Sequence, residues 1–309
     1  MKSALKIGTR GSKLALWQAE WVKTEIEKAH PEIGIERIVI KTRGDKIQDV
    51  PLAKVGGKGL FVKEIEEALL DGRIDLAVHS MKDMPGDIPP GLCIGPVPER
   101  EIPVDVLISG SGKKLADLEK GSTIGTSSLR RAAQILHLRP DIDIVPLRGN
   151  LDTRLRKLDE GRMDAIVLAA AGVRRLGIEK RVTEYLNESR MLPAVAQGAL
   201  CIEIRESDPE VDSIVNTLNH PETRTIVMGE RAFLHRLEGS CQVPVAGHGT
   251  LENGRFTLKG LVANLDGSVV LKESVEGPAG QARELGMELA EKLLARGADR
   301  ILKELTAES

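Results

Sequence analysis

Aromatic residues are scarce in this chain of 309 residues. Only 2% of the sequence is Phe, Trp or Tyr, so we expect cores built from Leu, Ile, Val and Ala. Proteins that bind single-stranded nucleic acid stack its bases on aromatic side chains. The composition therefore argues against single-stranded nucleic acid as a ligand, and we expect no nucleic acid partner.

Cysteine is also rare, and Cys93, Cys201 and Cys241 lie far apart in the sequence. This spacing argues against a disulfide framework and fits a reducing compartment, so we expect a cytoplasmic protein. Zinc sites usually need ligands at short spacing, so we expect no metal. Cys93 and Cys201 lie in apolar runs, "LCIG" and "ALCIEI", and are expected to be core residues.

Long apolar runs are missing as well. No stretch approaches the roughly 18 apolar residues that a transmembrane helix needs. The N-terminal sequence "MKSALKIGTRGSKLALWQ" contains only a short apolar patch, interrupted by Gly, Thr and Arg. We therefore expect neither a membrane span nor a signal peptide.

The positive charge that is present is concentrated in one segment. Residues 126–175 contain ten Lys and Arg against six Asp and Glu, a local charge of +4 in a chain of net charge −2. Arginine offers a fork of donors that matches carboxylates and phosphates. The segment therefore indicates an anionic ligand.

Predicted strands and helices alternate along the first two thirds of the chain, which is typical of parallel βαβ units. A pattern recurs in the same order: "IGTRGS", "TRGD" and "DGRIDLAVHS" at 7–12, 42–45 and 71–80 are echoed by "IGTSSL", "LRGN" and "EGRMDAIVLA" at 124–129, 147–150 and 160–169. The repeat predicts two similar α/β lobes of the periplasmic-binding-protein type. An anionic ligand would bind in the cleft between them, near helix N-termini.

We expect three domains. Residues 1–100 plus about 195–218 form the first lobe, 101–194 the second lobe, and 219–309 a small C-terminal α+β domain. Within "LPAVAQGALCIEIR" (192–205) we expect a helix start and a strand that returns to the first lobe. In the last domain we expect a helix over 222–237, a loop over 238–249, three antiparallel strands and one long terminal helix.

Cys241 lies in "EGSCQVPVAGHG", which is rich in Gly and Pro. A thiol on a loop can be a nucleophile, a metal ligand or an attachment point. A nucleophile needs a positioned base, and only His235 and His248 are near it in sequence. The residues alone leave these alternatives open.

Seven fragments together resemble porphobilinogen deaminase, also called hydroxymethylbilane synthase. They are "TRGSKLALWQAEWV", "VGGKGLFVKEIEEALLDGRIDLAVHSMKDMP", "GTSSLRRAAQ", "LRGNLDTRLRKLD", "AIVLAAAGVRRLG", "LPAVAQGALCIE" and "RLEGSCQVPVAGHG". The resemblance runs from about residue 5 to the C-terminal helix. It implies an enzyme that joins four porphobilinogen units head to tail into hydroxymethylbilane and releases ammonia. It also implies a dipyrromethane cofactor, bound through a thioether to Cys241.

The same resemblance implies roles for further residues. Asp83, in "HSMKDMP", would be the catalytic carboxylate, which stabilises the cation formed when the amine leaves. It follows a buried strand, where open α/β sheets place ligands. Side chains implied to bind cofactor and substrate are Arg10, Ser12, Lys82, Thr126, Ser127, Ser128, Arg130, Arg131, Arg148, Arg154, Arg175 and Gln197.

Lys54 and Lys58 flank a Gly-rich stretch that would form a flap. For Arg156, Lys157, Arg162 and Arg174 we expect solvated positions on helices. We expect a monomer that passes its product to uroporphyrinogen-III synthase. Two other readings stay open: a two-lobed anion or solute receptor without catalysis, and a cysteine acyltransferase.

Overall fold

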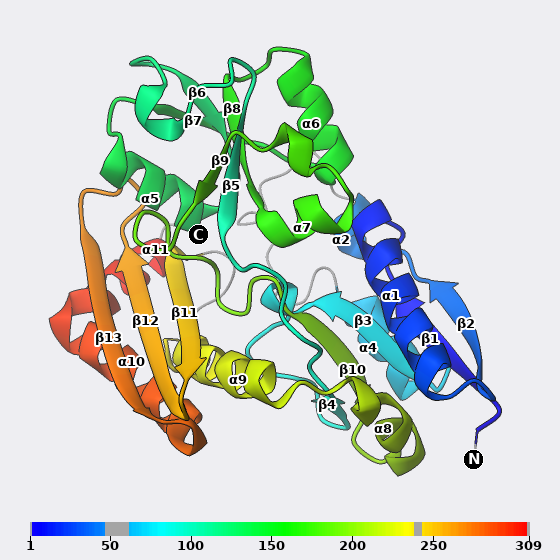
Figure 1. Cartoon of the computed structure of the whole chain (residues 1–309). Helices are drawn as coiled ribbons and strands as arrows, with labels where there is room; N and C mark the ends of the chain where they lie inside the picture. The colour runs from blue at the N-terminus through cyan, green and yellow to red at the C-terminus, as the bar shows by residue number, and fades with distance from the viewer. Residues whose placement is uncertain (1, 47–61, 238–242, 308–309) are drawn as a thin grey trace. The chain divides into compact units, whose positions relative to one another are not determined.

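Two five-stranded mixed sheets and one three-stranded antiparallel sheet organise the protein (Figure 1). The computed structural model describes residues 2–46, 62–237 and 243–307. Packing divides the chain into two units with boundaries after Glu101, Gly198 and Arg224. The first sheet belongs to one unit, and the other two sheets belong to the second.

The first sheet has the strand order β2-β1-β3-β10-β4. β1 runs parallel to β2 and β3, whereas β10 is antiparallel to both of its neighbours. The strands are β1 (Ala4–Thr9), β2 (Gly34–Val39), β3 (Leu76–Ser80), β4 (Leu92–Ile94) and β10 (Leu200–Arg205). The helices of this unit are α1 (Lys13–Ala29), α2 (Arg43–Lys46), α4 (Lys63–Leu70) and α8 (Pro209–Val215), with 3-10 turns η1 (Met81–Asp83) and η4 (Asn216–Leu218).

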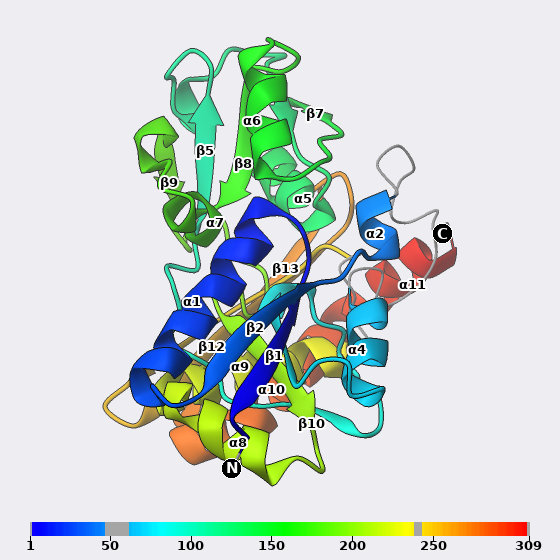
Figure 2. The same cartoon turned by 90° about the vertical axis from the view of Figure 1, so that its right-hand side faces the viewer.

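Helices cover both faces of this sheet, with α1 and α4 on opposite sides (Figure 2). On one face, α1 and α8 pack against β1, β3 and β10, in a core that includes Leu5, Ile7 and Ile202. On the other face, α4 packs with Ala77 and Leu92. Because both faces are covered, the strands read as continuous apolar runs.

The second sheet repeats this topology, with the order β7-β6-β8-β5-β9. β6 runs parallel to β7 and β8, and β5 is antiparallel to β8 and β9. The strands are β5 (Asp105–Ser109), β6 (Thr123–Gly125), β7 (Asp143–Val145), β8 (Ala165–Ala169) and β9 (Glu184–Leu186). The helices are α5 (Leu129–Leu138), α6 (Leu151–Asp159) and α7 (Ala170–Arg175), with 3-10 turns η2 (Leu115–Asp117) and η3 (Glu179–Arg181). The predicted pair of similar lobes is confirmed: the repeated motifs overlap β1 and β6, and β3 and β8, which occupy matching positions in the two sheets.

The third sheet has the order β11-β12-β13, and α10 lies along it (Figure 1). Its strands are β11 (Val245–Glu252), β12 (Arg255–Ala263) and β13 (Val270–Pro278). The helices of this region are α9 (Pro221–Arg236), α10 (Ala282–Leu293) and α11 (Asp299–Ala307), with the 3-10 turn η5 (Ala279–Gln281) and the π-helical turn η6 (Leu294–Ala298). The α/β fold class and the three-stranded C-terminal sheet are confirmed.

Three local expectations were wrong. Residues 245–249 belong to strand β11 and not to a loop. Glycine in this segment permits close packing: a Cβ on Gly249 would lie 2.7 Å from the ring of Phe256. Residues 192–199 are irregular, with a turn over 195–198 in which Ala196 has a φ of 57°, and no helix starts there. The single C-terminal helix is interrupted at Gly297, whose φ of 101° is incompatible with α-helix.

Candidate functional site

The turn that carries Asp83 follows directly from the end of β3. Met81, which is fully buried, anchors the 3-10 turn η1, and its N–H donates to the carbonyl of Ala199 at 3.0 Å. Two residues later, Asp83 is exposed. The buried strand and the anchored turn therefore hold an exposed carboxylate at the carboxyl end of the sheet.

Asp83 lines a cavity of about 70 Å³. The cavity is formed by the end of β1, the first turns of α1, the N-terminal end of α4 and the end of β3. Its lining residues are Arg10, Ser12, Leu14, Ala15, Gln18, Val62, Val78, His79, Ser80 and Asp83. Three residues that the family resemblance implied, Arg10, Ser12 and Asp83, thus lie around one small cavity.

Ser12, which lines this cavity, also has a structural role in α1. It is the N-cap of α1, and its hydroxyl accepts the N–H of Ala15 at 3.3 Å. Gln18, one turn further, is buried and donates to the hydroxyl of Ser80 at 2.9 Å. Gln18 and His79 were not predicted as site residues. A polar side chain on the buried face of α1 was the signal for Gln18. Lys82 is half-buried and is not among the lining residues.

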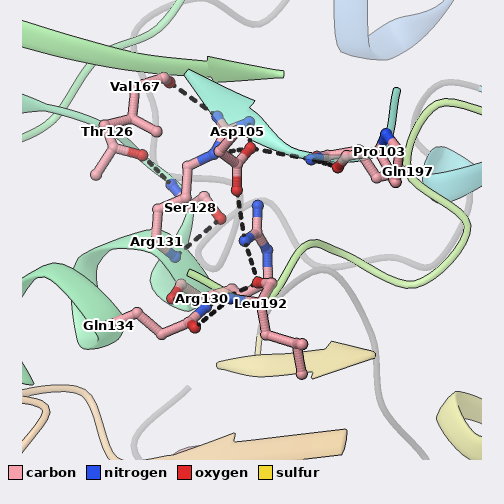
Figure 3. Close-up of polar contacts among 10 residues, drawn as sticks. All are labelled: Pro103, Asp105, Thr126, Ser128, Arg130, Arg131, Gln134, Val167, Leu192 and Gln197. Carbon is pink, nitrogen blue, oxygen red and sulfur yellow. Dashed lines mark hydrogen bonds and ion pairs between the residues drawn. The ribbon is translucent and has the colours of Figure 1, made fainter. Parts of the chain in front are cut away.

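The predicted arginine pair of the second unit surrounds a buried carboxylate, Asp105, at the start of β5 (Figure 3). Arg130 donates from Nη1 to its Oδ2 at 2.7 Å, and Arg131 donates from Nε and Nη2 to its Oδ1 at 3.1 and 2.7 Å. Asp105 is 0% exposed, and the arginines are 5% and 6% exposed. The first turn of α5 therefore places two guanidinium groups around one carboxylate inside the protein.

Carbonyl groups and an amide complete this Asp105 cluster. Arg130 also donates to the carbonyl of Leu192 at 2.8 Å, and Arg131 donates to that of Val167 at 3.0 Å. Gln197, a predicted site residue, is fully buried and donates from Nε2 to Asp105 Oδ1 at 3.0 Å. Hydrogen bonds to charged groups are stronger than those between neutral groups. The cluster thus ties β5, α5 and the 192–197 segment together.

Electrostatics keep Asp105 ionised. Burial by itself would raise the pKa of this carboxyl, but the charges of Arg130 and Arg131 outweigh burial and hold the pKa far below its usual range. The sequence analysis missed Asp105. The signal was available, because a charged residue inside the apolar run "IPVDVLIS" is rarely buried unless it is paired.

The predicted hydroxyl residues shape the loop before α5. Thr126 is buried, and its hydroxyl accepts the N–H of Ser128 at 3.1 Å. The hydroxyl of Ser127 donates to the carbonyl of Leu147 at 3.0 Å. Ser128 is the N-cap of α5 and accepts the N–H of Arg131 at 3.4 Å. In this structure the three hydroxyls therefore define where α5 begins.

Three further predicted arginines are half-buried at the ends of elements. Arg154 donates from Nε to the carbonyl of Gly149 at 2.8 Å, and Arg175 donates from Nη2 to that of Gly198 at 2.7 Å. Arg148 precedes Asn150, the N-cap of α6. Within the described residues, the guanidinium of Arg148 has no hydrogen bond or ion pair. Arg148 is therefore available to an anion in a way that Arg130 and Arg131 are not.

Three of the predicted residues belong to ranges that the structure does not describe. Cys241, Lys54 and Lys58 lie outside the described residues. Of the other two thiols, Cys201 is buried as predicted, and Cys93 is half-buried at the edge strand β4.

No group of three His, Cys, Asp or Glu side chains with metal-binding geometry occurs within the described ranges. None of the helices described there has the length and hydropathy to cross a membrane.

Comparison with known proteins gives a single family over nearly the whole chain. Residues 5–213 match the family described as "Porphobilinogen deaminase, dipyromethane cofactor binding domain", and residues 225–295 match "Porphobilinogen deaminase, C-terminal domain". Porphobilinogen deaminase of Syntrophotalea carbinolica is 57% identical over 303 residues, which is 98% of this chain and 96% of that protein. The Geobacter metallireducens protein of the same name is 55% identical over 301 residues, 97% of this chain and 94% of the relative. Among solved structures, the methionine-binding protein MetQ is similar at 13% identity, with a TM-score of 0.45 over 70% of this chain and 89% of that chain.

Proposed function

The chain belongs to the porphobilinogen deaminase family, and we propose that it joins four porphobilinogen units head to tail into hydroxymethylbilane. It is a transferase of tetrapyrrole biosynthesis, its substrate is porphobilinogen, and it contains a domain that binds a dipyrromethane cofactor. The observation that carries the proposal is the cavity in which Arg10, Ser12 and Asp83 meet.

Asp83 is the proposed catalytic residue. When the amine leaves porphobilinogen, positive charge develops on the methylene-pyrrole that remains. A carboxylate fixed beside that group stabilises the charge and accepts hydrogen bonds from the pyrrole N–H. The anchored turn η1 holds Asp83 in place before the reaction, so no reorganisation is needed when the charge appears.

Arginines of the chain would hold the acidic side chains of the pyrroles. Arg10 lines the same cavity as Asp83. The half-buried guanidinium of Arg148, which has no partner among the described residues, fits a carboxylate of a bound cofactor. The same role is proposed for Arg154 and Arg175 on the basis of their family motifs; each donates to a backbone carbonyl from a half-buried position.

Cys241 is the proposed attachment point of the cofactor, through a thioether. When bound, the dipyrromethane would supply the free pyrrole carbon from which the chain grows. Lys54 and Lys58 are proposed to belong to a flap. Support for these three residues comes from their family motifs in the sequence.

Three domains, a monomeric state and a cytoplasmic location are also proposed. The domains would be 1–100 plus about 195–218, 101–194, and 219–309. The three separate sheets support this division, and the first two sheets each have a core of their own. The product would pass to uroporphyrinogen-III synthase, and neither nucleic acid nor a membrane would be a partner.

The intact mass of the purified protein tests the cofactor. We expect it to exceed the mass of the chain by two linked pyrrole units, and Cys241→Ser should abolish the increase. An unmodified mass from cells that make porphobilinogen would contradict the proposal and favour a solute receptor. Rapid alkylation of Cys241 in the active protein would instead favour a cysteine acyltransferase.

Turnover tests the catalytic residue. Asp83→Asn keeps the shape and loses the negative charge, so we expect the rate to fall about 100- to 1,000-fold, while cofactor can still be loaded. Asp87→Asn, an exposed position four residues further, is the matched control and should retain activity. A near-normal rate in Asp83→Asn would show that this carboxylate is not the catalyst.

A further inference from the structure

A buried histidine connects the cavity wall to a carboxylate behind it. In the antiparallel pair of β3 and β10, His79 is opposite Cys201, and Ala77 is opposite Glu203. Alternate residues share a face of a sheet, so His79 and Glu203 lie on the same face. Nε2 of His79 lies 3.1 Å from Oε2 of Glu203. His79 also lines the cavity that contains Asp83.

A second carboxylate covers the same face. Ala77 packs with Ile65 and Ala68 of α4, so this helix lies over the face that carries His79 and Glu203. Glu66 of α4 is 8% exposed, and Glu203 is 0% exposed. Burial, then the charge of Glu203, raises the pKa of Glu66 to about 7, with a smaller contribution from Glu67.

Each carboxylate has a buried oxygen without a donor. Within the described part of the chain, Oε1 of Glu66 and Oε1 of Glu203 are buried and have no hydrogen-bond partner. A buried charge without a partner is unfavourable, and a carboxyl group escapes this cost by binding a proton. His79, Glu203 and Glu66 do not belong to any group with metal-binding geometry in the described residues. The two buried oxygens without a donor thus make a proton the species that these carboxyl groups can bind.

The ionisable groups around the cluster come from four elements. Glu66 experiences the charges of Glu203 on β10 and Glu67 on its own helix. Glu203 contacts His79 on β3. Burial first, and then nearby charges that include Glu203, raise the pKa of the Cys93 thiol on β4. Each of these groups except His79 is acidic. Loss of the Glu66 proton therefore adds negative charge to a region that already carries it.

We propose that Glu66, with Glu203 and His79, is a proton-linked control of the charge behind the cavity of Asp83. Glu66 binds a proton at lower pH and releases it to solvent at higher pH. The release places one more negative charge behind the cavity wall. That charge favours the cation that forms beside Asp83 when the amine leaves, so the rate rises with pH. Glu66 is a positioning residue, and the effect on rate rests on the function proposed above.

The pH dependence of turnover tests this inference. In the holoenzyme we expect kcat to rise through about pH 7. Glu66→Gln keeps the shape and never ionises, so this rise should be lost. Its rate should be about three- to tenfold below wild type at pH 8 and equal to wild type at pH 6, the size expected for one charge several ångströms away in a medium of intermediate dielectric constant. Glu67→Gln, an exposed neighbour on the same helix, should keep the rise. An unchanged pH profile in Glu66→Gln would overturn the proposal.

A second measurement does not depend on activity. Infrared spectra of the holoenzyme should contain the carbonyl band of a protonated carboxyl group at pH 6, and this band should disappear at pH 8. Glu66→Gln should lack the band that titrates, and Glu67→Gln should retain it. A titrating band that persists in Glu66→Gln would assign the proton to another group and refute the inference. If the wild-type protein does not convert porphobilinogen, the proposed function is wrong, and the infrared spectrum still tests whether Glu66 gains and loses the proton.

Discussion

Asp105 offers the most direct test of the structure, because its carboxylate is the only negative charge that Arg130 and Arg131 contact among the described residues. Asp105→Ala removes the acceptor of four hydrogen bonds, three from the arginines and one from Gln197. Two guanidinium groups then remain inside the protein without a counterion. Breaking a buried ion pair by removing one partner costs about 3–5 kcal/mol. Asp105→Asn should cost less, because its amide oxygen still accepts a hydrogen bond.

Native-state hydrogen exchange in increasing urea is the appropriate assay, because it reports the unit that contains the cluster. The amides of β5 and α5 should lose about 3–5 kcal/mol of protection in Asp105→Ala. The matched control is Asp159→Asn, which breaks an exposed ion pair with Arg181. Surface pairs contribute about 0–1 kcal/mol, so the control should stay close to wild type.

The pH dependence gives a further check on Asp105. Its pKa is lowered in the folded protein, so the stabilisation is fully present above the unfolded pKa of about 4 and is lost as pH falls towards the folded pKa. The difference between wild type and Asp105→Asn should therefore be constant from pH 5 to 8 and should shrink only below about pH 4. A loss under 1 kcal/mol in Asp105→Ala, or a difference that changes between pH 6 and 8, would refute the reasoning.

Four other substitutions have expected outcomes. Arg148→Leu should lose cofactor, measured by intact mass, without loss of stability, whereas Arg131→Leu should lose both because it leaves Asp105 underpaired; cofactor retained in Arg148→Leu would contradict its role. Gly249→Ala places a methyl group 2.7 Å from the Phe256 ring and should cost about 1–3 kcal/mol in urea unfolding; a neutral result would mean that the strand can shift. Glu66 has a raised pKa, so its contribution to stability is present below about pH 4.5 and declines by about 3 kcal/mol as pH rises to 7; Glu66→Gln should remove this decline, and a variant with the wild-type decline would disprove it.

Sequence periodicity predicted the large elements correctly because their apolar patterns are local. The repeat "IGTRGS" and "IGTSSL" predicted two sheets of like topology, and β1 and β6 occupy matching positions. Prediction failed where long-range packing decides the backbone. The glycines of 245–249 read as loop residues, but they are strand residues that make room for Phe233 and Phe256. The local sequence pattern does not show that an aromatic ring from a distant part of the chain packs against these glycines.

The site divides in the same way. Motifs in the sequence singled out Asp83 and Arg10, and the capping position of Ser12 follows from local rules, because a cap depends on residues within one turn. By itself the sequence therefore determined the family, the presence of two similar α/β lobes and the chemical types of the site residues. Only the tertiary structure decided that Arg130 and Arg131 face Asp105, and that His79 joins Glu203 behind the cavity. These pairs are 25, 26 and 124 residues apart, and the strength of a buried charge pair depends on distance and burial, which exist only once the chain has folded.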